Sequence, residues 1–414
     1  MANVSSSNGL EKRPKLRFPG FDEPWHGKPF GDLIQEYSDR TQTEDEDTLL
    51  SAAIEGMFLN SELFGHQRGA SNKGYKKIKY GTMVLSTQNL HLGNANVNLR
   101  FKNGMVSPAY KTYDITGCSI ELLAHWIKSD AAKHFFYNAT TVGASMCRRN
   151  VEWKTLYEQP LFLPSTDEQD KIASFLSFLT QRIDAQQKYV ATLKKYKRGL
   201  SDELFGEKGP GERWMTVPFS EAFDLLQNNT FSRDEMSTEN GIAYNIHYGD
   251  VLIKYGAVVD LSKSKVPYIR SDVSLSKFAR SSYLRNGDIV IADTAEDYTV
   301  GKAVEIVGVA DTKALSGLHT IPCRPKISFA SMYLGYFINS KRFRTQILPL
   351  VQGTKVSSIS KSEIQKTSIA FPSFEVQSQI ASVLYALDHR IDICQACVHG
   401  LVRTKEALLQ QLFI

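Results

Sequence analysis

Basic side chains, which bind phosphate groups, are concentrated in two stretches of the sequence. Residues 68–80 contain five lysines and arginines, two tyrosines and no acidic residue. Residues 254–285 contain seven lysines and arginines against two aspartates. Lysine and arginine contact the phosphates of nucleic acids, and arginine, asparagine and glutamine read base edges. One such stretch is typical of a solvated surface, but its occurrence in both halves of the chain favours a nucleic-acid ligand.

Two loops offer a second kind of phosphate site, because backbone N–H groups beside a basic side chain can hold an anion. One is residues 353–355, which precede an expected helix start, and its counterpart in the first half is residues 142–150. Either loop can equally be a polar surface loop without a ligand. The DNA-binding candidates from these four segments are Arg68, Asn72, Lys73, Lys76, Lys77, Lys79, Arg148, Arg149, Lys254, Lys263, Lys265, Arg270, Lys277, Arg280, Thr354 and Lys355.

Patterns that indicate catalysis or metal binding are few. The sequence has no G-x-x-x-x-G-K-[ST] motif and no Pro-Pro pair, which argues against an ATP-driven motor and an amino-methyltransferase in this chain. Cys394 and Cys397 form a C-x-x-C pair without a second pair, so a core-facing thiol is predicted and no metal site. Asp297 followed by Asp311-x-Lys313 is similar to a metal-dependent nuclease set, and a stand-alone nuclease is therefore one alternative hypothesis.

Length and composition predict two globular domains in a reducing compartment. A chain of 414 residues exceeds one ordinary hydrophobic core. No run of about 18 apolar residues could cross a membrane, and the N-terminus lacks the apolar stretch of a signal peptide, so a cytoplasmic protein is expected. The five scattered cysteines fit reduced thiols. A net charge of +5 permits a polyanionic partner without requiring one.

One segment of the chain occurs twice. Residues 164–205 match residues 372–413 at a constant offset of 208, sharing P-S-x-x-x-Q-x-x-I-A-S and R-I-D. The motif W-x-x-x-P-F also occurs twice, at Trp25 and at Trp214, with an offset of 189. An internal repeat defines the fold before any local pattern does. The predicted domains are residues 1–163, a spacer helix at 164–206, a second domain at 207–371 with its linker at 206–213, and a second spacer helix at 372–414.

The repeated segments carry apolar residues at alternating intervals of four and three, as in helices that pair along their length. The predicted seam residues are Ile172, Leu176, Leu179, Ile183, Val190, Leu193, Leu200 and Leu204 in the first copy, and Ile380, Leu384, Leu387, Ile391, Val398, Leu401, Leu408 and Leu412 in the second. Lys197 and Lys405 occupy equivalent seam positions and either set the register or reach solvent. Ser165 and Glu168 form an expected capping box.

The connectivity favours antiparallel pairing of these helices. About 40 residues make a helix of roughly 60 Å, and a parallel pair would require the second domain to carry the chain back over that distance. The expected arrangement is a dumbbell with pseudo-two-fold symmetry and one domain at each end. A coiled-coil adaptor that does not bind nucleic acid is the second alternative.

The domains between the helices read as mixed α/β. Short apolar runs that follow glycine predict strands at 81–90, 249–259 and 287–294, and amphipathic patterns predict helices at 120–136 and 330–348. The predicted fold class is α/β, with two mixed α/β domains separated by an antiparallel pair of long coiled-coil helices.

The stretch PKLRFPGFDEPW at 14–25, the repeated P-S-x-x-x-Q and R-I-D segments and the closing KEALLQQLF resemble the specificity subunit of type I restriction-modification enzymes. The resemblance implies that each domain reads one half of a bipartite double-stranded DNA site and that the helix pair sets the spacing. It implies two methyltransferase (modification) subunits and restriction/translocase subunits as partners. S-adenosylmethionine, ATP and Mg would be bound by those partners, and this chain would be non-catalytic and bind no cofactor. Val376 departs from the family pattern at the position equivalent to Glu168.

Overall fold

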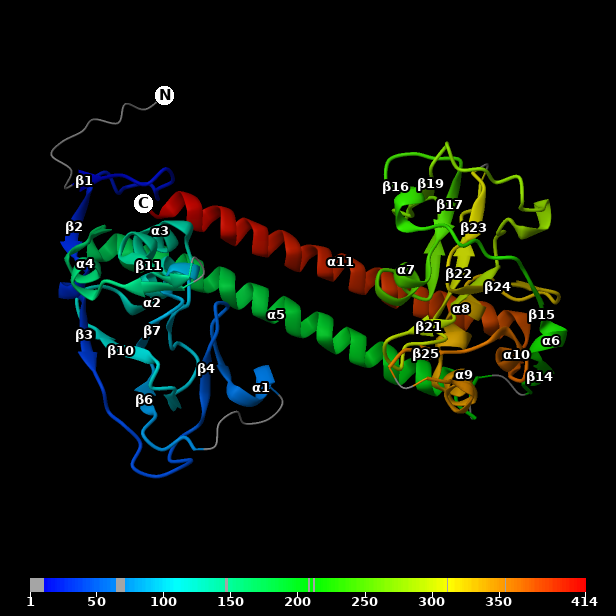
Figure 1. Cartoon of the computed structure of the whole chain (residues 1–414), viewed down its shortest axis with the longest axis horizontal. Coiled ribbons are helices and arrows are strands. Elements are labelled where there is room, and N and C mark those ends of the chain that lie inside the picture. The colour runs from blue at the N-terminus through cyan, green and yellow to red at the C-terminus, as the bar shows by residue number, and fades with distance from the viewer. Residues whose placement is uncertain are drawn as a thin grey trace. The chain divides into compact units, whose positions relative to one another are not determined.

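The computed structural model describes residues 11–64, 71–145, 148–207, 209–210, 213–310, 312–353 and 355–414. The chain divides into two compact units (Figure 1): unit 1 comprises residues 1–187 and 396–414, and unit 2 comprises residues 188–395. Two helices of 39 residues each, α5 (Thr166–Leu204) and α11 (Phe374–Leu412), contribute one half to each unit. The domain boundaries predicted from the sequence stay a prediction.

Unit 1 is built around an antiparallel sheet of order β3-β10-β7-β8. Its strands are Ile34–Tyr37, Tyr110–Ile115, Met83–Ser86 and Ala95–Val97, in sheet order. Helices α2 (Ile120–Trp126) and α3 (Asp130–Asn138) lie beside the start of α5 (Figure 1). The remaining elements are β1 (Glu11–Lys12), β2 (Trp25–Pro29), β4 (Leu50–Ala52), β5 (Met57–Leu59), α1 (Asn60–Phe64), β6 (Lys76–Lys79), β9 (Asn103–Val106), β11 (Thr140–Ser145), β12 (Arg148–Val151), α4 (Trp153–Glu158) and β13 (Pro160–Leu163).

Unit 2 is built around a mixed sheet of order β15-β24-β20-β22-β18, in which β18 and β22 run parallel. Its strands are Phe223–Leu225, Thr320–Pro325, Ile289–Ala292, Ala303–Val307 and Val258–Asp260. Helices α8 (Tyr333–Asn339) and α9 (Lys341–Ile347) correspond to α2 and α3 of unit 1. The other elements are β14 (Met215–Pro218), α6 (Phe219–Ala222), β16 (Met236–Ser237), β17 (Ala243–Ile246), α7 (Tyr248–Ile253), β19 (Tyr268–Ile269), β21 (Thr294–Ala295), β23 (Ala314–Ser316), β25 (Ser357–Ser358), α10 (Lys361–Ile364) and β26 (Ser368–Phe371).

The two repeated sequence motifs meet in space in both units. Strand β2, which begins with the tryptophan of W-x-x-x-P-F in unit 1, pairs antiparallel with β13, the strand that leads into α5. Strand β14 pairs in the same way with β26, which leads into α11. The phenylalanine that closes each motif, Phe30 or Phe219, is fully buried. The motif therefore anchors the start of each domain to the strand that precedes its long helix.

The long helices pack antiparallel within each unit. In unit 1 the start of α5 and the end of α11 share a core, in which Ile172 and Leu176 lie with Leu409 and Leu412. All of the predicted seam residues are buried or half-buried, whereas the positions between them are mostly exposed, as the alternation of four and three requires. The mixed α/β class and the two long helices predicted from the sequence are confirmed.

The structure differs from the sequence expectations in three places. The stretch 249–259 is not a strand along its length, since α7 occupies its first part. Each of the helices predicted at 120–136 and 330–348 is two short helices. The break lies at Ser129 or Ser340, whose hydroxyl donates to a carbonyl of the preceding helix at the point where the next helix begins. Within the described residues no helix is long and apolar enough to cross a membrane.

The third difference concerns the expected capping box at the start of α5. The Glu168 carboxylate is fully buried and accepts two hydrogen bonds of 2.7 Å from the guanidinium of Arg17, which raises the pKa of Arg17. Because both of its carboxylate oxygens bind Arg17, Glu168 attaches the segment before β2 to α5 and does not form the reciprocal bond of a capping box.

Candidate nucleic-acid interface

The glutamine of the repeated segment joins each long helix to its own domain by the same hydrogen bonds. Gln169 and Gln377 donate to the carbonyl of the proline five residues earlier, at 3.0 and 2.9 Å. The side-chain oxygen of Gln169 accepts from the backbone N–H of Ser119 at 2.9 Å, and that of Gln377 accepts from Ala330 at 3.0 Å. Both glutamines are buried, so these bonds fix the first turn of each helix against the residues that precede α2 or α8.

The seam lysines also make equivalent contacts. Lys197 on α5 forms an ion pair with Asp388 on α11 in unit 2, and Asp388 also accepts from the Tyr336 hydroxyl at 2.8 Å. In unit 1 Lys405 donates to the Thr180 hydroxyl at 2.7 Å, and burial lowers the pKa of Lys405. Thr180 and Asp388 are related by the same offset of 208 as the two lysines. The lysines therefore bind across the seam and fix its register, rather than reaching solvent.

Two members of the first basic stretch are buried. Asn72 is 3% exposed, and its side-chain amide bonds Asp45 at 2.7 Å, where it holds a turn. Lys76 lies inside β6 and is 6% exposed, and burial lowers its pKa. Burial takes both side chains out of the surface that a ligand could reach. Arg68 lies outside the described residues.

The rest of that stretch lies at the surface with acidic neighbours. Lys77 forms an ion pair with Glu46, and Lys79 forms one with Asp114 at 3.0 Å. Lys73 is exposed, and within the described residues it has no ion-pair partner. Exposed ion pairs are weak, so these lysines remain able to exchange an acidic neighbour for a phosphate.

The loop at 142–150 is a hairpin formed by β11 and β12. Arg149 donates to both the hydroxyl and the carbonyl of Thr140 at 2.7 Å and lies over the ring of Tyr137 at 4.1 Å. Its guanidinium is therefore used to brace the hairpin. Arg148 lies in β12.

The second basic stretch is exposed, and half of its candidates carry local ion pairs. These pairs are Lys254 with Asp250, Lys263 with Asp260 and Arg270 with Asp272. Lys265, Lys277 and Arg280 are exposed and have no ion pair within the described residues. Lys277 lies over the rings of Phe231 and Phe278 at 4.8 and 5.3 Å.

The loop at 353–355 is attached to the sheet region by the pairing of β21 with β25. Lys355 is exposed and Thr354 lies outside the described residues. Next to β21, His319 has a positive φ of 54° and lies 3.5 Å from the Thr294 hydroxyl and edge-on to the Tyr248 ring. A non-glycine residue in this conformation is uncommon and is found often at binding sites.

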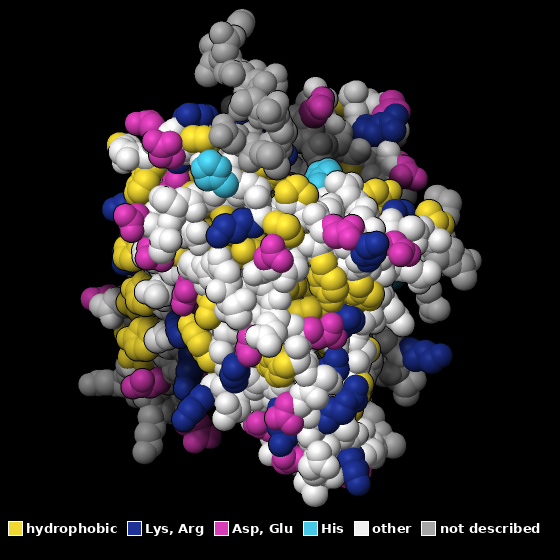
Figure 2. Space-filling view, turned by 90° about the vertical axis from the view of Figure 1, so that its left-hand side faces the viewer, with side chains coloured by type: hydrophobic (Ala, Val, Ile, Leu, Met, Phe, Trp, Pro, Cys, Tyr) yellow, Lys and Arg dark blue, Asp and Glu magenta, His cyan; other side chains and the backbone are white. Residues whose placement is uncertain are grey.

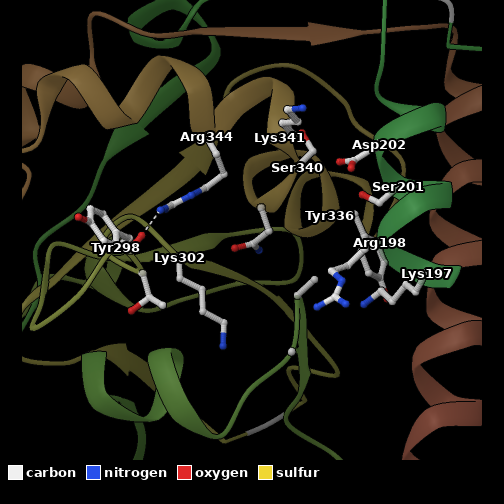
Figure 3. Close-up of a pocket in the computed structure, with 14 residues that line it drawn as sticks. Lys197, Arg198, Ser201, Asp202, Tyr298, Lys302, Tyr336, Ser340, Lys341 and Arg344 are labelled. Atoms are coloured by element: carbon white, nitrogen blue, oxygen red, sulfur yellow. Dashed lines mark hydrogen bonds between the residues drawn. The ribbon is translucent and has the colours of Figure 1, made fainter. Parts of the chain in front are cut away.

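A basic pocket of about 580 Å³ lies where the domain of unit 2 meets the end of α5. Five of its lining residues are cations, against one acidic residue, Asp202; these cations are Lys197, Arg198, Lys302, Lys341 and Arg344. Figure 3 shows Arg198 reaching from α5 into the space in front of Lys302. The sequence did not reveal this cluster, because its members come from α5, from the residue before β22 and from α9, and so form no basic run.

Figure 2 shows the face of unit 1 that carries β2, β3 and α4, where basic and acidic side chains are interspersed. A polyanion is attracted by charges of one sign gathered together, so this face lacks the electrostatic signal of a DNA surface.

The alternative chemistry finds little support in the described residues. Cys394 is 5% exposed, at a seam position, which agrees with a core-facing thiol. Asp297 accepts hydrogen bonds from the N–H and hydroxyl of Thr299, which lower its pKa. Lys313 lies over the Tyr283 ring at 5.2 Å, and Asp311 is outside the described residues. Among the residues that the structure describes, no cluster of three metal-ligating side chains is found.

Comparisons with known proteins agree on one family. Residues 212–396 match the family model described as "Type I restriction modification DNA specificity domain". The chain is 23% identical over 342 residues to the type I restriction enzyme MjaVIII specificity subunit of Methanocaldococcus jannaschii, an alignment that covers 78% of this chain and 73% of that protein.

Two solved structures share the fold over nearly the whole chain. The S subunit of a type I restriction-modification system from M. genitalium has a TM-score of 0.56 at 14% identity, with 97% of this chain and 99% of that one covered. A chain from a study of complex assembly and conformational transition of the type I R-M system has a TM-score of 0.55 at 15% identity, with 96% and 99% covered.

Proposed function

We infer, from the membership of residues 212–396 in the family of type I restriction modification DNA specificity domains, that this chain is the DNA-recognition subunit of a type I restriction-modification system. Proteins of this family recognise DNA and are not themselves catalytic. The observation that carries the proposal is the repeated scaffold: the same glutamine bonds and the same strand pairing hold a different domain in each unit.

Each domain is proposed to read one half of a bipartite double-stranded DNA site. The two units keep the contacts to their helices but differ between β3 and β10 and between β15 and β24, which is where two different half-sites would be read. The proposed surface consists of the basic candidates that are exposed, together with the half-buried Lys77. These are Lys73, Lys77, Lys79, Lys254, Lys263, Lys265, Arg270, Lys277, Arg280 and Lys355. Such contacts position the duplex, while loop side chains supply base recognition.

The proposed partners follow from the same function. Two modification subunits would dock on the repeated helices and bring S-adenosylmethionine, and restriction/translocase subunits would bring ATP and Mg. This chain would bind none of these cofactors. Because its ligand is DNA, the proposed place of action is the cytoplasm.

Selection from a random duplex library tests the proposal. The full chain with its modification subunits should enrich a split motif, and a contiguous motif or no motif would overturn the proposal. Arg280→Ala tests the contribution of unit 2. It should weaken DNA binding and lower its salt dependence. The bases selected in the half-site of unit 1 should stay unchanged, since phosphate contacts carry no sequence information.

The proposed ruler role of the helices is tested by length. Each helix has 39 residues, about 58 Å at 1.5 Å per residue. Inserting one heptad into both α5 and α11 adds about 10 Å, or roughly 3 base pairs at 3.4 Å each, to the expected gap. Both half-sites should stay unchanged. An unchanged gap, or altered half-sites, would contradict the ruler.

A further inference from the structure

The basic pocket of unit 2 has fixed walls. Lys302 donates to the carbonyls of Leu252 and Tyr255 at 2.9 and 2.8 Å, and Arg344 donates to the carbonyls of Val300 and Tyr298. These bonds hold two positive charges at the back of the pocket. Burial and the charge of Lys197 lower the pKa of Lys302. The positive charges of Lys302 and Lys197 repel each other, and a bound anion would offset this repulsion.

Two further cations are available to a ligand. Arg198 on α5 and Lys341 at the start of α9 line the pocket, and neither has an ion pair or hydrogen-bonded acid within the described residues. Tyr298 stands at the rim with 86% of its surface exposed. Free cations around an open, solvent-accessible hollow with an exposed aromatic ring form a surface suited to a nucleic-acid backbone.

Two positions of the corresponding place in unit 1 carry the opposite charge. The offset of 208 places Glu406 at the position of Arg198. Asp130 follows Ser129 at the start of α3 as Lys341 follows Ser340 at the start of α9, and each serine bonds the carbonyl three residues earlier, at 2.7 and 2.6 Å. At these two positions unit 1 therefore has acids, of which Asp130 forms an ion pair with Lys133 at 2.8 Å, and unit 2 has two cations. Packing cannot account for this reversal, because all four side chains are exposed.

We propose that the pocket bounded by Arg198, Lys302 and Lys341 binds a phosphate of the DNA backbone, outside the bases that unit 2 reads, and that unit 1 makes no such contact at its corresponding place. This inference rests on the proposed function. The two free cations belong to the repeated scaffold, Arg198 to α5 and Lys341 to α9, whereas Lys302 and Tyr298 come from the segment between β15 and β24, in which the units diverge. A contact made by the scaffold carries no sequence information, which is the property of a phosphate contact.

Methylphosphonate scanning of the bound duplex tests this contact. Replacing one backbone phosphate at a time by a neutral methylphosphonate should reveal a position beside one half-site at which the wild-type complex binds several-fold more weakly. In the variant Arg198→Ala/Lys341→Ala the same methylphosphonate should not weaken binding further, because the contact with that phosphate is already lost. The logarithmic salt slope of this variant should fall by about 1 to 2, as expected for one or two phosphates. The selected sequence should not change.

The control is the matching pair of unit 1, Glu406→Gln/Asp130→Asn, which should leave the methylphosphonate profile and the salt slope unaltered. The proposal would be overturned if the methylphosphonate weakened DNA binding by Arg198→Ala/Lys341→Ala as much as it weakens binding by the wild type. An unchanged salt slope in this variant would also overturn it. Loss of all split-motif selection by the wild-type complex would instead count against the proposed function. Sodium triphosphate provides the last arm: if the pocket variant loses thermal stabilisation by triphosphate but binds DNA as the wild type does, the pocket holds a free phosphate and not DNA.

Discussion

The two units share the contacts that hold the scaffold together and differ in the charges placed on it. Gln169 and Gln377 make the same pair of hydrogen bonds, and the seam lysines reach the same position on the opposite helix. Glu168, however, is replaced by Val376. Buried hydrogen bonds to the backbone constrain residue type strongly, whereas a charge can change with its partner. The comparison teaches which parts of the repeat specify the fold and which are free to specialise.

The largest effect is expected at the start of the long helix, where unit 1 has a buried ion pair and unit 2 has Val376 in place of the acid. Glu168→Val imitates unit 2 and leaves Arg17, whose side chain is 15% exposed, without its partner. Breaking a buried pair costs about 3–5 kcal/mol. Urea unfolding of the full chain should show this loss.

The control for this prediction is the double variant Arg17→Leu/Glu168→Val, which removes both charges. It should recover most of the lost stability, because an apolar pair of similar volume replaces an ion pair at little cost. If the single and double variants lose the same free energy of unfolding, the unpaired charge on Arg17 is not what destabilises the protein, and the two units would then not differ in this respect.

The second expectation is that the units respond oppositely to pH. In unit 2 burial raises the pKa of Glu305 to about 7, although its carboxylate accepts from the N–H groups of Met332 and Gly335 at 2.5 and 2.9 Å. The folded form then binds a proton more tightly than the unfolded form. Its contribution to stability is therefore present below about pH 4.5 and is lost as pH rises to about 7, by about 3 kcal/mol.

In unit 1 burial lowers the pKa of Lys128 to about 8, where its ammonium donates to the carbonyls of Ile54 and Ala95. The unfolded form holds the proton more tightly, so stability rises with pH between about 8 and 10.5. Urea midpoints measured across both windows check these signs. Glu305→Gln should remove the fall in the lower window and leave the rise that His125 contributes there, since burial lowers the pKa of His125 to about 4. Lys128→Met should change the slope in the upper window alone. A variant that changed both slopes would contradict the separate assignment.

Periodic features could be predicted from the sequence, and contacts between distant residues could not. The seam follows from spacing alone, because a heptad pattern sustained over the whole helix has one interpretation. Strands β7 and β20 lie within the predicted runs because β20 is apolar at every position and β7 at all but its last, Ser86. Helix α7 was missed, since its cap is the His247 side chain, which accepts from the N–H of Gly249 at 3.1 Å, and histidine is not a usual capping signal.

The same limit applies to the site. Arg17 and Glu168 are separated by 151 residues, and no local pattern connects them. The pocket cations come from three elements for the same reason. In the first basic stretch, burial of Lys76 depends on which face of β6 meets the core, which the alternation of a short lysine-rich strand does not reveal. Asn72 is buried through its bond to Asp45, 27 residues away in the sequence. Sequence located the scaffold well and the charged surface poorly, because a surface is assembled by the fold.

The third expectation concerns the contact that the units share. Gln169→Leu and Gln377→Leu each leave a backbone N–H without its acceptor near the core, which costs about 2 kcal/mol. Because the two sets of bonds are the same, the two variants should lose stability equally. Hydrogen exchange at the first turns of α5 and α11 locates each effect. A large difference between the two variants would show that the shared motif is not equivalent in the two units.

The smallest effect is expected at the seam lysines, where the units differ by a single partner. Asp388→Thr gives unit 2 the partner that unit 1 has, and it also removes the acceptor of the Tyr336 hydroxyl, so a loss of about 1–2 kcal/mol is expected. Thr180→Asp gives Lys405 a carboxylate, and unit 1 should gain up to about 1 kcal/mol, since burial at present disfavours the charge on Lys405. The gain should vanish in Thr180→Asp/Lys405→Met, which separates pairing from a change in helix propensity. If Thr180→Asp instead destabilises unit 1, that result would show that the seam is too apolar here for a second charge. The neighbouring His125 is consistent with such a seam, because it bonds Ser177 at 3.0 Å and its pKa is lowered to about 4 by burial and by Lys405. The identity of the partner would then be set by the burial of each seam end rather than by free variation of charge.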